Sequence, residues 1–248
     1  MGVTSDHVRR NRARWDELAD SYQAQHGDFI RKTQPSWGVW QIPESQLGAL
    51  GEVAGKDVLE LGCGAGQWGE RLTTRGARVV GLDLSARQLA HAGPELVRIQ
   101  ASAEELPFND RAFDLVFCDH GALTFSDPWR SIPEAARVLR PSGLLIFSHA
   151  HPLYDLCWLP GDRYVRRELV RDYFGLHAIE DEDGLCTFQL TFSEWLALFR
   201  ASSLSVETLL EPRPAAGASS TYRTTEDLAW ARRFPMEVIW RLRRTPDR

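Results

Sequence analysis

The sequence lacks the features that mark membrane, secreted or metal-binding proteins. No apolar run approaches the roughly 20 residues that a membrane-spanning helix needs. The beginning of the chain is polar and charged, unlike a secretory signal peptide. The four cysteines are scattered, with neither a C-x-x-C pair nor a metal-binding spacing, so we expect buried free thiols. These absences predict a soluble, cytoplasmic protein with no membrane partner and no metal.

An excess of basic residues is also missing. The chain has 29 Lys and Arg against 34 Asp and Glu, a formal net charge of −5. A broad nucleic-acid-binding face usually needs clustered basic residues. The one basic cluster, between Arg9 and Arg14, is typical of the solvated face of a helix. We therefore expect no nucleic-acid partner, and 248 residues are enough for one large domain.

Residues 58–72 are the most informative stretch of the sequence. A short apolar run predicts a buried parallel strand, and Gly62, Gly64 and Gly66 follow before a helix-compatible pattern. A strand, a glycine turn and a helix form the front half of a nucleotide-binding βαβ unit. Glycine lets a ligand lie against bare backbone there. A dinucleotide loop, G-x-G-x-x-G, would need glycine where this chain has Gln67, which argues against a nucleotide-dependent oxidoreductase.

Asp83 ends the second apolar run, about 20 residues after the glycine turn. An acidic residue at this place accepts hydrogen bonds from ribose hydroxyls in nucleotide-binding folds. The alternative is that it caps the next helix, a role that Ser85 could equally fill. Together with the glycine turn, Asp83 is predicted to be a ligand-binding residue.

Three segments resemble one family in the expected order. The pattern E-x-G-x-G-x-G at residues 60–66 resembles the first motif of the class I S-adenosylmethionine-dependent methyltransferases. Residues 101–108 and 113–118 resemble the family's third and fourth strand ends, and Leu-Arg-Pro-x-Gly at 139–143 is a further resemblance. The resemblance covers roughly half the chain and implies S-adenosylmethionine as cofactor, with Asp83 on its ribose. Ser102 stands where the family often has an adenine-binding Asp, and a hydroxyl accepts more weakly than a carboxylate.

The resemblance implies a set of cofactor-binding residues. From the glycine loop and its flanks we expect Glu60, Gly62, Cys63, Gly64, Gly66 and Trp68. From the ends of the following strands we expect Asp83, Leu84, Gln88, Ser102, Ala103, Glu104 and Asp119. The N-terminal aromatic residues Tyr22, Trp37 and Trp40 would cover the sulfonium by cation–π contact and exclude water. The alternative is that the tryptophans only fasten the N-terminal helix to the sheet.

Alternating strand and helix patterns predict an α/β fold. The expected sheet is Rossmann-like, doubly wound, seven-stranded and mostly parallel, with an antiparallel last strand at its edge. The predicted strands cover residues 57–61, 78–82, 96–100, 114–118, 144–148, 205–210 and 237–242. Residues 1–43 are expected to form an N-terminal helical lid. Residues 44–248 would form the methyltransferase domain, with an insertion at about 149–190.

Histidines follow two of the predicted strands. His120 comes after the fourth strand, and His149 and His151 come after the fifth. Methyl transfer from a sulfonium needs mainly alignment, and a base helps when the acceptor is a hydroxyl or an ammonium. We expect His120 to face the acceptor, with His149 or His151 as the alternative. A merely structural role is the competing interpretation for each histidine, and H-x-H without a carboxylate cluster is weak evidence for a metal.

The segment after the fourth strand bears on the nature of the acceptor. Enzymes of this class that methylate amino groups of nucleic acids usually have Asn/Asp-Pro-Pro-aromatic there, whereas residues 119–125 read Asp-His-Gly-Ala-Leu-Thr-Phe. This favours a small-molecule acceptor with an O-, N- or C-nucleophile, and secondary metabolism is one setting expected for such an acceptor. The alternatives are a methyltransferase acting on RNA or protein, or a non-catalytic S-adenosylmethionine-binding module. The sequence identifies neither the acceptor nor the oligomeric state.

Overall fold

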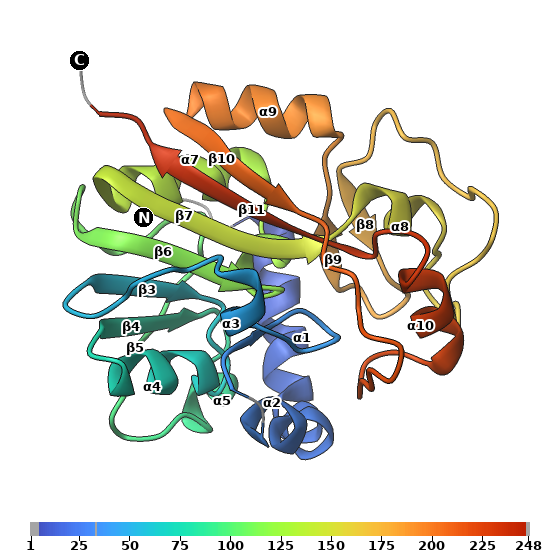
Figure 1. Ribbon diagram of the computed structural model, residues 1–248, viewed down its shortest axis with the longest axis horizontal. Coiled ribbons are helices and arrows are strands. Elements are labelled where there is room, and N and C mark those ends of the chain that lie inside the picture. The colour runs from blue at the N-terminus through green and yellow to red at the C-terminus, as the bar shows by residue number, and fades with distance from the viewer. Residues whose placement is uncertain (1–4, 33, 247–248) are drawn as a thin grey trace.

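A seven-stranded sheet forms the centre of the computed structural model, which describes residues 5–32 and 34–246 (Figure 1). The strand order is β10-β11-β7-β6-β3-β4-β5. The bounds are β3 (Asp57–Leu61), β4 (Arg78–Asp83), β5 (Val97–Gln100), β6 (Phe113–Asp119), β7 (Leu139–Ala150), β10 (Leu204–Leu210) and β11 (Glu237–Arg244). Strands β3 to β7 are parallel to one another, and the order reverses between β3 and β6. The expected doubly wound, Rossmann-like sheet is confirmed.

The last strand is antiparallel, as predicted, but its predicted place at the edge is wrong. β11 lies between β7 and β10 and pairs antiparallel with both. Its residues Val238, Ile239 and Trp240 are all buried, so both faces of the strand are covered. β10 takes the edge, where most of its residues are exposed. A continuous apolar run such as 238–240 is typical of an interior strand.

Apolar side chains cover the sheet on both faces, because successive residues of a strand point to opposite sides. One core joins Leu59, Val116 and Trp240 to helices α7 (Pro128–Val138) and α9 (Phe192–Ala201). The other joins Val58 and Phe117 to helix α4 (Gln67–Thr74). The remaining helical segments are α1 (Asp6–Tyr22), the π-helical η1 (Gln23–Gly27), α2 (Asp28–Lys32), α3 (Glu44–Leu47), α5 (Ala86–Ala90), α6 (Ala122–Phe125), α8 (Pro152–Leu156) and α10 (Thr225–Ala231).

Three local features shape the elements around the sheet. Helix α3 ends at Leu47, because Gly48 adopts a left-handed conformation there. Helix α9 is capped by Thr191, in a reciprocal capping box with Glu194. Strand β7 contains a bulge near its start, where Ser142 has a φ of 65°.

The segments outside the main sheet gather near the carboxyl ends of its parallel strands. The insertion carries α8 and the hairpin of β8 (Ala178–Glu180) and β9 (Cys186–Phe188), beyond the arrowhead of β7 (Figure 1). A second small hairpin, β1 (Ser36–Trp37) with β2 (Ile42–Pro43), precedes β3 in the chain. Helix α1 contacts both α5 and β9. Among the residues that the structure describes, none of the helices has the length and apolar character of a membrane span.

Candidate active site

A cavity of about 430 Å³ lies across the carboxyl ends of β3, β4, β6 and β7. Its floor includes the ends of these strands, at Glu60, Asp83, Asp119 and His149. Its walls come from α1, the β1–β2 hairpin, the insertion, and the segment around Tyr222. The volume lies within the range of small-molecule sites, and the place is where open α/β sheets bind ligands.

The glycine loop after β3 has no room for a side chain at its start. Gly62 has a φ of +73°, and a Cβ there would lie 2.1 Å from the backbone nitrogen of Ala122. A Cβ on Gly64 would meet nothing closer than 3.7 Å, so the backbone there borders open space. The Gly64 amide donates to Asp83 Oδ2 at 2.8 Å, which ties the loop to the end of β4.

Asp83 is a buried acid at the end of β4. Its Oδ1 accepts from the Ser85 amide at 2.8 Å, and burial raises its pKa above the ordinary aspartate value. Ser85, not Asp83, caps helix α5, because the Ser85 hydroxyl accepts from the Gln88 amide at 3.0 Å. The alternative capping role for Asp83 is therefore wrong, and the carboxylate lines the cavity.

The expected site residues fall into two groups. Those lining the cavity are Tyr22, Glu60, Gly62, Cys63, Gly64, Trp68, Asp83, Leu84, Gln88, Ser102, Ala103, Asp119, His120 and His149. Those outside its lining are Trp37, Trp40, Gly66, Glu104 and His151. Most of the predicted set is thus brought to one place, from elements far apart in the sequence.

Neither Trp37 nor Trp40 borders the cavity, contrary to the expected cation–π cover. Trp37 is 1% exposed, donates its indole N–H to Glu44 Oε2 at 2.7 Å, and packs against Trp68 with ring centroids 5.1 Å apart. Trp40 belongs to a separate core cluster with Tyr154. Both rings serve packing, because a fully buried indole directed into the core has no face free for a ligand.

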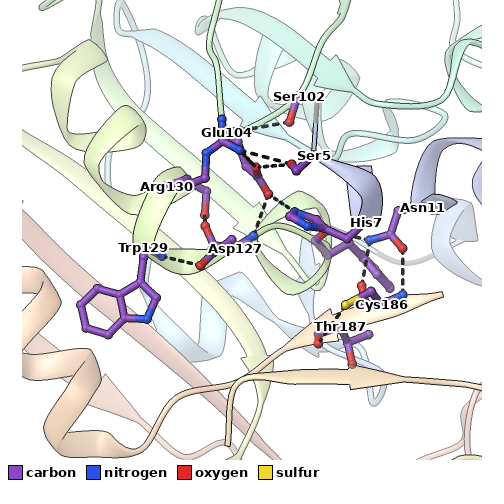
Figure 2. Close-up of polar contacts among 12 residues, drawn as sticks. Ser5, His7, Asn11, Ser102, Glu104, Asp127, Trp129, Arg130, Cys186 and Thr187 are labelled. Carbon is purple, nitrogen blue, oxygen red and sulfur yellow. Dashed lines mark hydrogen bonds and ion pairs between the residues drawn. The ribbon is translucent and has the colours of Figure 1, made fainter. Parts of the chain in front are cut away.

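Glu104 also points away from the cavity, toward the start of α1 (Figure 2). Its Oε1 lies 2.5 Å from His7 Nε2 and accepts from the Asp127 amide at 2.9 Å. Its Oε2 accepts from the Ser5 hydroxyl at 3.2 Å and lies 3.0 Å from Arg130 Nη1. With its side chain 2% exposed, this carboxylate is a buried anchor for the N-terminal helix.

Further polar contacts hold α1 across the cavity. The Asn11 amide donates to the carbonyls of Phe125 and Cys186, each at 2.8 Å, and accepts from the Cys186 amide (Figure 2). At the other end of the helix, Gln23 donates to Gln88 Oε1 at 2.8 Å. Since Gln88 lines the cavity beside the glycine loop, the N-terminal helix spans from the insertion to the expected cofactor site.

His120 follows β6 in a left-handed conformation with a φ of 47°. Such a conformation is uncommon for a residue with a side chain and is often found at functional sites. His120 Nε2 lies 2.7 Å from Glu237 Oε1, and the imidazole is 25% exposed. Burial alone would lower its pKa, but the hydrogen bond and charge of Glu237, with the charge of Asp119, raise the pKa above the ordinary histidine value.

Two buried carboxylates hold consecutive amides of the β1–β2 hairpin. Gly38 donates to Asp119 Oδ1 at 2.9 Å, and Val39 donates to Glu237 Oε1 at 2.7 Å. Asp119 also accepts from the Ser148 hydroxyl at 2.5 Å, and burial raises its pKa. Gly38 has to be glycine, because a Cβ would lie 2.5 Å from both Glu237 carboxylate oxygens and its φ is +72°. The hairpin and the acids beside His120 are therefore one connected unit.

The other two histidines have different surroundings. His149 stacks on Phe147 and accepts from the Trp240 indole at 3.2 Å, and burial, with the charges of His120 and His151, lowers its pKa to about 3. It is neutral near pH 7. His151 caps α8 by accepting from the Leu153 amide at 3.0 Å, and its Nε2 lies 3.0 Å from Glu211. Of the three candidates, only His120 combines a cavity position with an ion-pair partner.

Sequence reasoning missed three cavity residues near the end of the chain, Tyr222, Arg223 and Glu237. No motif surrounds them. The available signal for Glu237 was an acidic residue directly before the apolar run 238–240. Among the described residues, no group of three or more His, Cys, Asp or Glu is arranged to hold a metal ion.

A doubly wound sheet with a glycine loop, an acid after the second parallel strand and a cavity between them defines a Rossmann-like cofactor-binding protein. The family model of a methyltransferase domain matches residues 59–147. A solved S-adenosylmethionine-dependent methyltransferase from Mesorhizobium loti has a TM-score of 0.68 and 29% identity, covering 81% of this chain and 96% of that one. The chain is therefore similar to the S-adenosylmethionine-dependent methyltransferase family over this region.

Curated relatives agree with this family. An uncharacterized methyltransferase of Bacillus subtilis (strain 168) is 29% identical over 160 residues, 61% of this chain and 58% of the relative. A fatty-acid O-methyltransferase of Mycolicibacterium smegmatis is 38% identical over 117 residues, 44% of this chain and 42% of the relative. The chain thus spans less than two thirds of the length of either relative.

Proposed function

We propose that this protein transfers the methyl group of S-adenosylmethionine to a small-molecule acceptor inside the cavity. The observation that carries the proposal is that one cavity joins the glycine loop, Asp83 and His120. A cofactor site alone would not need a half-buried histidine paired with an acid beside the glycine loop. The fatty-acid O-methyltransferase among the relatives is in line with a small-molecule acceptor.

The cavity residues fit the cofactor. Backbone at Gly62 and Gly64 would approach its amino-acid part, Asp83 would accept from its ribose hydroxyls, and Ser102 would lie by its adenine. Glu60 Oε2 is buried without a hydrogen-bond partner among the described residues, and burial raises the pKa of this carboxyl well above its ordinary value. A bound ammonium group would supply the missing donor and favour the carboxylate.

His120 would act on the acceptor. When bound, S-adenosylmethionine supplies an activated methyl group, so the protein has to align the acceptor and receive its proton. The Glu237 carboxylate, 2.7 Å from His120 Nε2, would orient the imidazole and stabilise it once protonated. His149 serves the wall of the cavity in this proposal, because its lowered pKa makes it a poor proton acceptor at neutral pH.

We further propose that the N-terminal helix within residues 5–32 is a lid over the methyltransferase domain. Residues 1–4 and 33 of the expected lid segment, 1–43, lie outside the described residues. The polar anchors at Asn11, Gln23 and Glu104 support this proposal, since they attach the helix to the rim of the cavity by hydrogen bonds. Residues 36–43 are assigned to the domain, which was expected to begin at residue 44, because Trp37 is part of its core.

The test is mass spectrometry of a metabolite extract incubated with the protein and S-adenosylmethionine carrying an isotopically labelled methyl group. We expect a labelled small molecule with wild-type protein. Asp83→Ala should bind S-adenosylhomocysteine more weakly by about 1–3 kcal/mol in calorimetry, because ribose hydroxyls would lose their acceptor. Label appearing only in added RNA or protein would favour the alternative acceptors, and binding without any transfer would indicate a non-catalytic module.

A further inference from the structure

The cavity lining contains several buried polar atoms that have no hydrogen-bond partner within the described part of the chain. His120 Nε2 is one of them, although it lies in ion-pair contact with Glu237 Oε1. Two others are a donor, Arg223 Nε, and an acceptor, Glu237 Oε2. Both residues line the cavity. Buried polar groups in folded proteins are nearly always paired, so unpaired ones of opposite kind facing one space indicate what a ligand there would supply.

Arg223 is the one arginine, and there is no lysine, in the cavity lining formed by the described residues. Its guanidinium lies over the Tyr154 ring, 5.1 Å from the centroid, and this cation–π contact holds the group against the wall of the cavity. The acids of the same wall are engaged elsewhere. Asp155 Oδ2 accepts from Gln189 at 2.7 Å, and Glu237 Oε1 pairs with His120. The described residues thus provide no carboxylate within ion-pair distance of this half-buried cation.

We infer that Arg223 binds an anionic group of the methyl acceptor, a carboxylate or a phosphate, while the nucleophile of the same molecule faces His120 and Glu237. This inference rests on the proposed function and narrows its substrate class to hydroxy or amino compounds that carry an acid. A planar guanidinium suits the two oxygens of a carboxylate or phosphate. The reacting O–H or N–H faces His120, and the unpaired Glu237 Oε2 would accept from a second polar hydrogen of the acceptor.

The chemistry balances with these groups. The acceptor oxygen or nitrogen forms a bond to the methyl carbon, and the carbon–sulfur bond of the sulfonium breaks with its electron pair going to sulfur, which gives S-adenosylhomocysteine. The acceptor's proton passes to His120, whose imidazolium is paired with Glu237. The anionic group on Arg223 takes no part in bond making, so the product keeps it.

The experiment compares Arg223→Gln and Arg223→Lys with wild type, and uses Arg213→Gln as the matched control. Arg213 is an exposed arginine on the same loop and does not line the cavity. A metabolite extract is separated on an anion exchanger, and each fraction is incubated with labelled methyl donor. We expect labelled product only from the retained fraction, with the acid still free. Its rate of formation should fall at least about tenfold in Arg223→Gln and less in Arg223→Lys.

A direct binding measurement separates this inference from the proposed function. Benzoate, phenyl phosphate and benzamide are titrated into protein saturated with S-adenosylhomocysteine. We expect benzoate or phenyl phosphate to bind more tightly than the neutral amide. This preference should be lost in Arg223→Gln and kept in Arg213→Gln. The anion that binds more tightly shows whether the site suits a carboxylate or a phosphate. Equal binding of anion and amide, a neutral acceptor, or a product methylated on its acid would overturn the inference. Anion binding without methyl transfer would support the anion site at Arg223 and contradict the proposed methyltransferase activity.

Discussion

Glu237 Oε1 lies 2.7 Å from His120 Nε2, and this contact joins the start of the last strand to the end of β6. The same oxygen of Glu237 accepts from the Val39 amide. The N-terminal hairpin, the centre of the sheet and the final strand therefore meet at one imidazole. The strand inserted between β7 and β10 therefore contributes a cavity residue as well as pairing within the sheet.

The pH dependence of methyl transfer should reflect this pair. His120 accepts a proton only when neutral, so the single-turnover rate should rise with pH through its pKa, with a midpoint above the ordinary value of about 6.5. Glu237→Gln removes the charge that raises the pKa, so the midpoint should move to lower pH. Glu211→Gln, which alters the similar pair with His151 outside the cavity lining, is the control. An unchanged midpoint in Glu237→Gln would contradict this assignment.

The glycine loop gives a second test through a matched pair of substitutions. Gly62 and Gly48 both have positive φ, but only Gly62 of these two has a backbone atom within 4 Å of the missing Cβ. Gly48→Ala should cost about 1–2 kcal/mol of unfolding free energy from conformational strain alone. Gly62→Ala should cost more and also weaken binding of S-adenosylhomocysteine. Equal losses in urea titrations of the two variants would show that the loop does not pack tightly against the start of α6.

Removing α1 tests the proposed lid. The deletion should end at residue 32, because Trp37 and Gly38 belong to the folded domain. We expect a core that still unfolds cooperatively but turns over poorly, since Gln23 and the rest of the helix no longer close the cavity. Circular dichroism and turnover are the measurements. A truncated protein with full activity would rule out the lid.

His149 should make the fold sensitive to acid. Its folded pKa of about 3 lies below the unfolded value of about 6.5, so the unfolded chain binds the proton first. Its contribution to stability is complete above pH 6.5 and is lost as the pH falls from there toward 3, at up to about 1.4 kcal/mol per pH unit. Denaturant titrations at pH 7, 6 and 5 should show a flatter dependence in His149→Gln. The same slope as in wild type would refute the prediction.

Local motifs predicted one half of the site and missed the other. The glycine loop, Asp83 and the strand ends are contiguous patterns whose meaning depends on a strand and a turn, and the structure brings them together as expected. Arg223 and Glu237 reach the cavity only through the packing of the last segments, which no local periodicity encodes. The sequence also could not predict which way the side chains of Trp37 and Trp40 point. An aromatic residue that borders a site and one that packs beneath it occur in the same sequence pattern.

The most direct test of the proposed activity is a single-turnover measurement with protein in excess over labelled S-adenosylmethionine and with the acceptor-containing fraction present. Wild-type protein should convert the bound donor to S-adenosylhomocysteine and an equal amount of labelled product. His120→Asn should bind the donor with unchanged affinity and transfer its methyl group about 10²–10⁴-fold more slowly, the usual contribution of a general base. A loss of less than about tenfold would mean that His120 is not the base. If the wild-type protein converts none of the bound donor, the proposed methyltransferase activity is contradicted.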